Sequence, residues 1–409
     1  MNKPKGLPLE NIRVTDFSWV AAGPSATRVL AVLGAEIIKI ESARRVDLAR
    51  GRPPLAEGKT GINVSGAWMN YNVNKMAITL NMRHPKGLEL AKRLISISDV
   101  TAENFTGGVM DKWGLGYEEQ AKIRPDIIML SMPVMGKTGP RRDFGGYGMG
   151  IQATAGINFV MGRPDRMPVG TGIAYPDVGP NPRQAATALL AALRYRNKTG
   201  KGQFIELAQL ESTANYTGTS VIEFTANKTL QTRQGNRLGY AAPHGGYRCK
   251  GDDRWCVIAV FTDEEWKSFC DVIGSPSWTK EAKFATLLSR KQNEDELDAL
   301  VEEWTKERAA EEVMDLMQAA GVAAGVVQNG QDLLERDEHL KARESYAVVE
   351  HPEAGRTTHD EGYFKLSKTP GKVYAPAPVL GQDNDYVYRD ILGLTEDEMD
   401  QYIVEGILE

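Results

Sequence analysis

The sequence is poor in cysteine and histidine, and neither residue type forms a recognisable pattern. Cys249, Cys256 and Cys270 are the only cysteines among 409 residues, an odd number that argues against a disulfide framework and fits a reducing compartment. The spacing of the first two is poor for a metal, so buried thiols are expected. None of the five histidines falls in an H-E-x-x-H or comparable ligand set, so we predict no metal site.

Long apolar runs and a strong excess of one charge are also missing. No apolar stretch approaches the roughly 18 residues that a membrane span needs. The first residues, MNKPKGLPLENIRV, lack the apolar core of a signal peptide. We therefore expect a cytoplasmic protein without a membrane span. A net charge of −5 gives no broad basic surface for nucleic acid, although local basic groups can still bind a phosphorylated small molecule.

Several common catalytic and cofactor motifs are absent or misplaced. There is no G-x-S-x-G nucleophile turn. Residues 136–138 read Gly-Lys-Thr, but Ser131 stands where a phosphate loop requires glycine. A G-x-G-x-x-A pattern at residues 148–153 follows RRDFGGY rather than a strand, and no suitable acidic residue comes about 20 positions later. Neither a nucleotide-phosphate loop nor a tightly bound dinucleotide is predicted.

What is present is an alternation of strand and helix patterns. Short apolar runs predict strands, and apolar residues at helical spacing predict helices between them. An almost continuous apolar run at 126–134 suits a parallel strand that is buried on both faces. This alternation predicts a doubly wound, Rossmann-like α/β domain. Strands are expected at 11–17, 36–41, 99–105, 126–134 and 204–209, with helices at 25–35, 85–98 and from 183 onward.

The character of the chain changes near residue 225. A glycine-rich piece there precedes a predicted strand at 255–261 and three amphipathic helices, at 263–273, 294–307 and 309–320. We expect a large α/β domain over 1–224, a smaller α+β domain over 225–330, and a C-terminal segment over 331–409 that returns to the large domain. The last segment is proline-rich at 369–383 and has few helix signals before 395.

One acidic residue has an unusual setting. Asp177 lies in GTGIAYPDVGPNP, among small residues and helix breakers, just before the helical run RQAATALLAALRYR. Asn181 is predicted to cap that helix, with Pro182 in its first position. The simpler interpretation of Asp177 is a charge that stabilises the positive helix end. The alternative is a nucleophile, because a carboxylate with small neighbours can attack an acyl group.

Five blocks, in order along almost the whole chain, resemble the family III CoA-transferases of the CaiB/BaiF type, among them formyl-CoA and benzylsuccinate CoA-transferases. They are VTDFSWVAAGPSATRVLAVLGAEIIKIES, then NKMAITLNMRHPKGLELAKRLISISDVTAENFTGGVMDKWGLGYE, then ALRYRNKTGKGQFIELAQLES, then PAPVLGQDND and ILGLTEDEM. The resemblance implies an enzyme that moves CoA from an acyl-CoA to a free carboxylic acid. It also implies that Asp177 is the nucleophile and carries CoA as a thioester between the two half-reactions.

The resemblance also implies a CoA site, with CoA as substrate and no tightly bound cofactor. Arg83 and Lys112 are the expected phosphate partners, and Lys75 is either a further partner or part of a structural ion pair. The glycine-rich loop His244-Gly245-Gly246 is a candidate for oxyanion stabilisation, with an ordinary turn as the alternative. The matching positions are Ala21, Ala22, Lys75, Leu80, Asn81, Met82, Arg83, Asn104, Phe105, Thr106, Lys112, Gly145, Gly146, Tyr147 and Gly148.

The resemblance leaves substrates and assembly open. Succinyl-CoA is the favoured donor and an aromatic or substituted dicarboxylic acid, such as benzylsuccinate, the favoured acceptor. The family implies an interlocked homodimer, or a heterodimer or heterotetramer with a related chain, and no nucleic-acid or membrane partner. A 2-methylacyl-CoA racemase is the alternative activity, but the histidine and aspartate of that enzyme are missing from GGYGMGIQA at 145–153.

Overall fold

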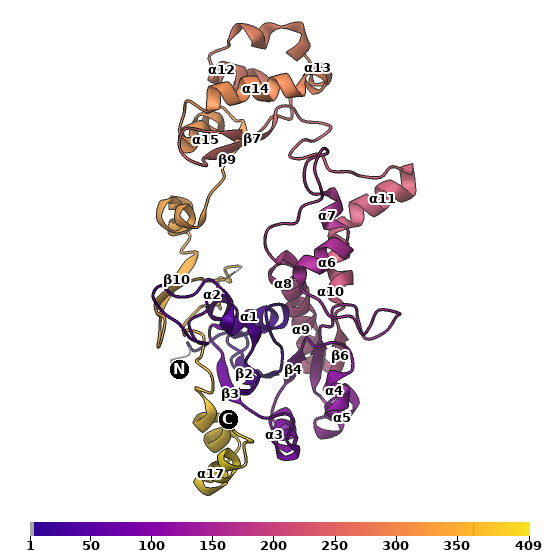
Figure 1. Ribbon diagram of the computed structural model, residues 1–409, viewed down its shortest axis with the longest axis vertical. Coiled ribbons are helices and arrows are strands. Elements are labelled where there is room, and N and C mark those ends of the chain that lie inside the picture. Colours follow the sequence, from indigo (N-terminus) through magenta and orange to yellow (C-terminus); the bar gives the residue numbers. More distant parts are fainter. Residues whose placement is uncertain (1–3, 363) are drawn as a thin grey trace. The chain divides into compact units, whose positions relative to one another are not determined.

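The computed structural model describes residues 4–362 and 364–409, which form two compact units. Of these residues, the larger unit comprises 4–159, 169–231, 341–362 and 364–409, and the smaller one 160–168 and 232–340. The sequence-based boundaries differ from this division, because they assign 160–168 and 225–231 differently and start the last segment at 331. Figure 1 labels the helices and strands of both units.

The larger unit is built on a six-stranded, fully parallel sheet. Its strands lie in the order β3-β2-β1-β4-β5-β6, so the chain reverses its direction of travel across the sheet between β1 and β4. The predicted α/β class is therefore confirmed, and this strand order is the doubly wound one. The strands are β1 (Arg13–Asp16), β2 (Glu36–Glu41), β3 (Met76–Thr79), β4 (Val100–Glu103), β5 (Ile128–Ser131) and β6 (Gln203–Glu206).

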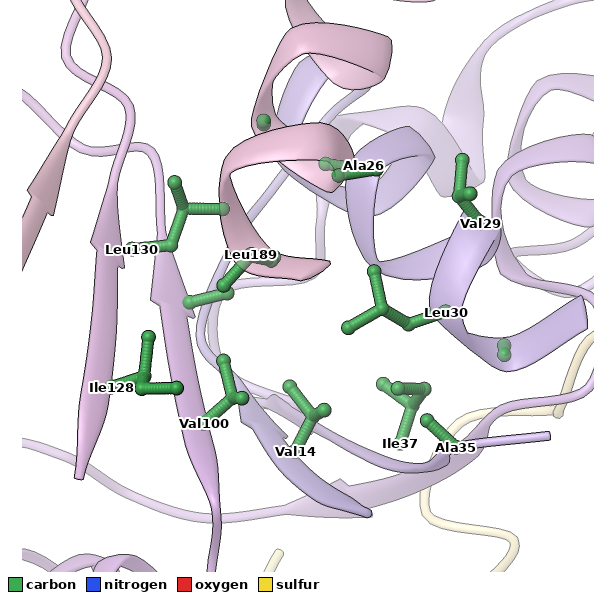
Figure 2. Packing of buried hydrophobic residues seen from close by; sticks show 14 of the residues in the cluster. Val14, Ala26, Val29, Leu30, Ala35, Ile37, Val100, Ile128, Leu130 and Leu189 are labelled. Atoms are coloured by element: carbon green, nitrogen blue, oxygen red, sulfur yellow. The ribbon is translucent and has the colours of Figure 1, made fainter. Parts of the chain in front are cut away.

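Two apolar layers sandwich this sheet. On one face, strand residues such as Val14 and Val100 pack against Leu30 of α1 (Ala22–Val32) and Leu189 of α9 (Pro180–Thr199), as Figure 2 shows. The other layer includes α3 (Pro85–Ser96) and the C-terminal helix α17 (Glu396–Val404). Burial on both faces explains why the strands read as apolar runs rather than as alternating patterns.

The start of α9 differs from the prediction. The helix begins at Pro180, with Gly179 as its N-cap, and no side chain caps it. Asn181 lies inside the first turn, fully buried, where its side chain contacts α10 (Gln209–Ala214) through Gln209 at 3.4 Å and Thr213 at 3.2 Å. The proposed cap at Asn181 is wrong because tertiary hydrogen bonds take up its amide.

The C-terminal segment covers the β3 edge of the sheet. The backbone of Ala77 in β3 exchanges hydrogen bonds with Asp383, whose N–H donates to the Ala77 carbonyl at 3.0 Å and whose carboxylate accepts from the Ala77 N–H at 2.9 Å. The side chain of Asn384 accepts from the Thr79 N–H at 2.9 Å. An unpaired strand edge is an aggregation hazard, and this extended segment satisfies its polar groups.

The sequence patterns missed a hairpin in the same segment. Strands β10 (Tyr346–His351) and β11 (Gly355–Asp360) pair antiparallel with each other alone. Further elements of the larger unit are η1 (Leu48–Gly51), α2 (Gly66–Asn72), α4 (Val109–Lys112), α5 (Tyr117–Ile123), α6 (Gly148–Thr154), α7 (Ile157–Val160, which ends in the smaller unit), α8 (Tyr175–Val178), η2 (Asn215–Thr217), α11 (Gly218–Asn227) and η6 (Tyr386–Ile391).

The smaller unit packs helices against a three-stranded antiparallel sheet in which β8 (Trp255–Ala259) lies between β7 (His244–Arg248) and β9 (Ala323–Val326). The three cysteines are free and buried, and all belong to its core, as predicted. Its helices and turns are α12 (Asp263–Val272), η3 (Ser277–Lys280), η4 (Ala282–Phe284), α13 (Leu287–Gln292), α14 (Glu294–Thr305), α15 (Ala310–Ala319), η5 (Asp332–Arg336) and, across its boundary, α16 (Glu338–Ala342). Across the described part of the chain, no helix combines the length and apolar character that a membrane crossing requires.

Candidate active site

The loop after β1 lies where the strand order reverses, the usual ligand position in such sheets. Its backbone is constrained. Val20 has φ 66°, a left-handed conformation that is costly for a β-branched residue. Both carboxylate oxygens of Asp47 accept from the Val20 N–H at 3.1 Å. The Asn104 side chain, at the end of β4, bonds both the N–H and the carbonyl of Trp19, at 2.7 and 2.8 Å. The loop that precedes Ala21 and Ala22 is thus fixed from two sides.

Beneath this loop lies a network of fully buried charges. Lys75 Nζ lies 3.3 Å from Asp16 and also donates to Asn72, Thr27 and the Pro24 carbonyl at 2.8 to 3.0 Å. Burial lowers the pKa of Lys75 to about 7, against the opposing effect of Asp16. Every donor of this ammonium group has an acceptor within the protein. This supports Lys75 as part of a structural ion pair and argues against its role as a phosphate partner.

The pKa of Asp16 is set by opposing effects within the same network. Burial raises the pKa of its carboxyl group, but the charges of Lys75 and Lys39 and the hydrogen bonds of Ser18 and Thr27 together hold the pKa below its ordinary value. Lys39 is itself buried and pairs with Asp47 at 3.6 Å. The network therefore joins the first three strands to the loop that Asp47 holds.

The loop after β4 is held by a buried carboxylate. Glu103 accepts from the Phe105 N–H at 2.8 Å and from the Ser131 hydroxyl. Burial raises the pKa of Glu103 to about 7, while these two hydrogen bonds act in the opposite direction. The ring of Phe105 lies edge-on to Trp19 and Trp113, with centroids 6.4 and 5.5 Å away. The positions predicted on this loop are Asn104, Phe105 and Thr106, and all three are partly accessible.

The positions predicted after β3 are less uniform. Leu80 is fully buried in the core, so its side chain is closed to a ligand. Asn81 is tied to the C-terminal segment through the carbonyls of Gly406 and Ile407, at 2.9 Å each. Met82 is half-buried, whereas Arg83 is exposed. Lys112, the last residue of α4, is also exposed. The two predicted phosphate partners are therefore accessible to an anion.

Asp177 lies in the short helix α8, which packs against α1, α6 and α9. Its side chain is buried, and its Oδ2 atom accepts a hydrogen bond from the Gly148 N–H at 2.9 Å. Gly148 is the first residue of α6, so the helix end that meets this carboxylate is that of α6 and not, as predicted, that of α9. Local sequence patterns did not indicate this helix, because the contact joins segments that are distant in the chain.

The pKa of Asp177 is raised to about 6. Burial is the main cause, and the Gly148 hydrogen bond and the positive charge of Arg52 act against it. At neutral pH the group is mostly ionised, yet it is less solvated than an exposed carboxylate. Such a carboxylate is suited to attack an electrophilic carbon that is brought to it.

Glycine is required beside the nucleophile candidate. A Cβ atom on Gly148 would lie 3.0 Å from both Cγ and Oδ2 of Asp177 and 2.9 Å from Cβ of Ala174. The predicted positions before Gly148 lie close to the loop after β4, because a Cβ on Gly145 would lie 3.7 Å from the Thr106 hydroxyl. Gly145, Gly146 and Tyr147 are exposed. The 145–148 segment thus runs from the β4 loop to Asp177.

Two residues near Asp177 were not predicted from the sequence. The guanidinium of Arg52 lies over the ring of Tyr147, 5.2 Å from its centroid. Tyr71 on α2 is half-buried, and its pKa is raised first by burial and then by the negative charge of Asp177, with Arg52 opposing. Both residues come from segments far from Asp177 in the chain, and no local motif distinguishes them.

Aromatic residues near Asp177 remain accessible. Tyr175 is 37% exposed and Tyr147 is 49% exposed. The neighbouring Met149 is 48% exposed, so none of these three side chains belongs to the core. A Cβ on Gly179 would lie 2.9 Å from the Tyr175 ring, which means that this ring packs on the turn between α8 and α9.

The segment predicted as an oxyanion loop is a strand. His244, Gly245 and Gly246 open β7 in the smaller unit and pair with β8 at residues 257–259. The backbone is therefore extended, because the strand pairing overrides the turn tendency of the two glycines. Among residues 4–362 and 364–409, no group of three histidine, cysteine, aspartate or glutamate side chains is arranged to hold a metal ion.

Comparison with known proteins gives consistent matches. The model of the family described as CoA-transferase family III matches residues 9–384. The chain is 33% identical over 393 residues to the succinyl-CoA–D-citramalate CoA-transferase of Chloroflexus aurantiacus, covering 96% of each chain. It is 31% identical to the succinyl-CoA–L-malate CoA-transferase beta subunit of the same organism, again covering 96% of each. The crystal structure of a CaiB/BaiF family protein from Brucella suis superposes with a TM-score of 0.85 at 28% identity, covering 94% of this chain and 99% of that one.

Proposed function

The chain belongs to family III of the CoA-transferases, and we propose that it transfers CoA through a thioester on Asp177. The observation that carries this proposal is the buried carboxylate of Asp177, bound at Oδ2 by the Gly148 N–H. Its second oxygen, Oδ1, accepts no hydrogen bond from any described residue, which leaves it available for attack.

The reaction then proceeds in balanced steps. Oδ1 attacks the thioester carbon of the donor, the carbon–sulfur bond breaks, and CoA leaves as a thiolate. The mixed anhydride on Asp177 is attacked at Cγ by that thiolate, and the donor acid leaves as a carboxylate. The product is an aspartyl-CoA thioester, which the acceptor carboxylate converts by the reverse sequence into a new acyl-CoA. No proton or electron is gained or lost overall.

The Gly148 N–H has a specific role in this scheme. When the thiolate attacks Cγ, negative charge develops on the oxygen that does not bridge to the acyl group, which is Oδ2. A donor already aligned on that oxygen stabilises the charge without reorganisation. A carboxylate is otherwise a weak nucleophile, so orientation and retention of CoA must supply much of the acceleration.

The proposed CoA site follows the carboxyl edge of the sheet from Asp177. The accessible members of the predicted set support it: Asn104, Phe105 and Thr106 after β4, the exposed residues 145–147, and the exposed cations Arg83 and Lys112. Ala21 and Ala22 are buried, at 5% and 3% exposure, which argues against direct contact between their side chains and a ligand. Lys75 and Leu80 contribute by holding the fold, because both are fully buried.

Succinyl-CoA is the proposed donor and a substituted dicarboxylic acid the proposed acceptor. The names of the two Chloroflexus aurantiacus relatives support the donor, and they also support a dicarboxylate acceptor. An aromatic substituent, as in benzylsuccinate, rests only on the accessible side chains of Tyr147, Tyr175 and Met149.

An oligomer is part of the proposal, as an interlocked homodimer or with a related chain. Helix α11 supports it, because none of its residues is buried in the single chain, and Val221, Ile222 and Phe224 are 58%, 67% and 47% exposed. An exposed apolar helix face of this kind marks an interaction surface. The relative named as a beta subunit supports the heteromeric version.

Mass spectrometry of the protein after incubation with succinyl-CoA tests the nucleophile. We expect CoA bound at Asp177 in the wild type, hydroxylamine to trap it, and no adduct in Asp177→Ala. Full transferase activity in Asp177→Ala would refute the assignment. Incorporation of deuterium at the α-carbon of a 2-methylacyl-CoA, without any adduct, would instead support the racemase.

A further inference from the structure

The position of Arg52 suggests a function that the nucleophile alone does not supply. Arg52 follows η1, and its guanidinium stacks on the Tyr147 ring, 5.2 Å from the centroid. Tyr147 directly precedes Gly148, whose N–H holds Asp177 at 2.9 Å. The charge of Arg52 acts on both Asp177 and Tyr71. A cation stacked on the ring of Tyr147, the neighbour of Gly148, thus acts electrostatically on the nucleophile candidate.

This cation is not neutralised by the protein. In residues 4–362 and 364–409, no carboxylate oxygen lies within 4.0 Å of the Arg52 guanidinium, and the residue is exposed. Arg50, two positions earlier, differs in each respect. It is fully buried, binds Glu41 through two nitrogens at 2.9 and 2.7 Å, and stacks on Trp68 at 3.5 Å. One arginine of this segment is therefore structural, and the other has a free planar fork of donors.

A guanidinium of this kind recognises carboxylates through two parallel hydrogen bonds. Resting on the proposed function, we propose that Arg52 binds the free carboxylate of a dicarboxylic acyl group while the thioester carbon of that group faces Asp177. In succinyl-CoA, two methylene groups separate these two ends. The site thereby selects dicarboxylic over monocarboxylic acyl groups, on both the donor and the acceptor side.

The electrostatics support this assignment. Bringing a dianionic acid next to Asp177 places like charges close together, which disfavours binding. A fixed cation beside the carboxylate offsets that repulsion and orients the acid. A charged hydrogen bond of this type is typically worth enough to change kcat/KM by roughly 10- to 100-fold.

The test compares succinyl-CoA with butyryl-CoA, which has the same chain length and no free carboxylate. The rate of adduct formation on Asp177 is measured in the wild type, Arg52→Ala and Arg52→Lys, each at a pH on the plateau of its own pH–rate profile, where Asp177 is ionised. We expect Arg52→Ala to lose roughly 10- to 100-fold with succinyl-CoA and to react with butyryl-CoA as the wild type does. Arg52→Lys should recover part of the loss, since it keeps the charge without the fork.

Lys122→Ala is the matched control, because it also removes one exposed cation, from an i,i+3 surface pair with Glu119. It should react with both thioesters as the wild type does. Equal losses of Arg52→Ala with both thioesters, or equal rates of the wild type with both, would overturn the role of Arg52 and leave the nucleophile intact. Absence of any adduct in the wild type would instead contradict the proposed function itself and, with it, this inference.

Inhibition of the wild-type enzyme provides a second measurement that does not depend on how the variants fold. Succinate should compete with succinyl-CoA at lower concentration than butyrate does, if Arg52 holds the free carboxylate. Equal inhibition by the two acids would count against the proposal.

Discussion

The charges beneath the β1 loop and the charges around Asp177 belong to the same unit but are treated in opposite ways. Lys75 and Asp16 are fully buried, paired and surrounded by further hydrogen-bond partners. Asp177 is also buried, yet it has a single backbone donor, and Arg52 has no ion pair among the described residues. Groups with complete sets of partners fix the structure, whereas groups with incomplete sets are free to meet a substrate.

Substitutions in the two regions should therefore change stability in opposite directions. Lys75→Met leaves the Asp16 carboxylate buried without its main partner, and we expect a loss of about 3–5 kcal/mol. Asp177→Asn removes a buried charge that folding disfavours, and we expect a gain of roughly 1–3 kcal/mol at pH 8. Denaturant unfolding of both variants beside the wild type measures these changes.

The pH dependence provides the control for this comparison. The pKa of Asp177 rises on folding from 3.8 to about 6, so its ionisation destabilises the folded state as pH rises through that interval. The gain in Asp177→Asn should be full above pH 6 and vanish below pH 3.8. A gain at pH 8 no larger than that at low pH, or a Lys75→Met variant as stable as the wild type, would contradict the contrast between the two regions.

The position of the Asp177 carboxylate can be changed without removing any charged group. Gly148→Ala places a methyl group 3.0 Å from Cγ and Oδ2 of Asp177, and we expect adduct formation to slow by roughly 10- to 100-fold because the carboxylate is displaced. Gly150→Ala, in the same helix, meets no atom within 4 Å and is the matched control. It should keep the rate and gain up to about 1 kcal/mol of stability from helix propensity. Equal rates in the two variants would show that the fit at Gly148 is unimportant.

The mildest perturbation is a change of pH alone. Only the ionised carboxylate attacks, so kcat/KM for adduct formation should rise as pH increases through about 6 and then level off. Arg52 holds the pKa of Asp177 down, so in Arg52→Ala the rise should move to higher pH. A profile that stays flat from pH 5 to pH 8 would be inconsistent with the raised pKa of Asp177.

Local patterns predicted much of the fold. Residues 36–41 and 294–305 form the expected elements, and their apolar residues, such as Ile38 in the strand and Leu297 in the helix, are buried as predicted. The family blocks, rather than local physics, favoured Asp177 over the role of a helix-end charge. The failures were at long range: the helix that meets Asp177 is α6, and Asn181 bonds α10 instead of capping α9.

Arg52 and Tyr71 could not be predicted from the sequence for the same reason. Nothing in their neighbourhoods in the sequence distinguishes Arg52 from Arg50, and only the tertiary structure pairs one with Glu41 and leaves the other beside Tyr147. Sequence periodicity reports which face of an element is buried. It does not report which side chains from distant parts of the sequence are in contact, and an active site consists mainly of such contacts.

The C-terminal segment that pairs with β3 has a consequence for the synthesis and folding of the protein. Residues 76–79 emerge from the ribosome early, but their partners Asp383 and Asn384 follow only after the whole smaller unit has been synthesised. The smaller unit is nearly contiguous in the chain, so it can fold while the larger one still lacks its last layer. Until residues 383 and 384 arrive, β3 presents an open strand edge, and nascent chains should be most prone to misassociation during that interval.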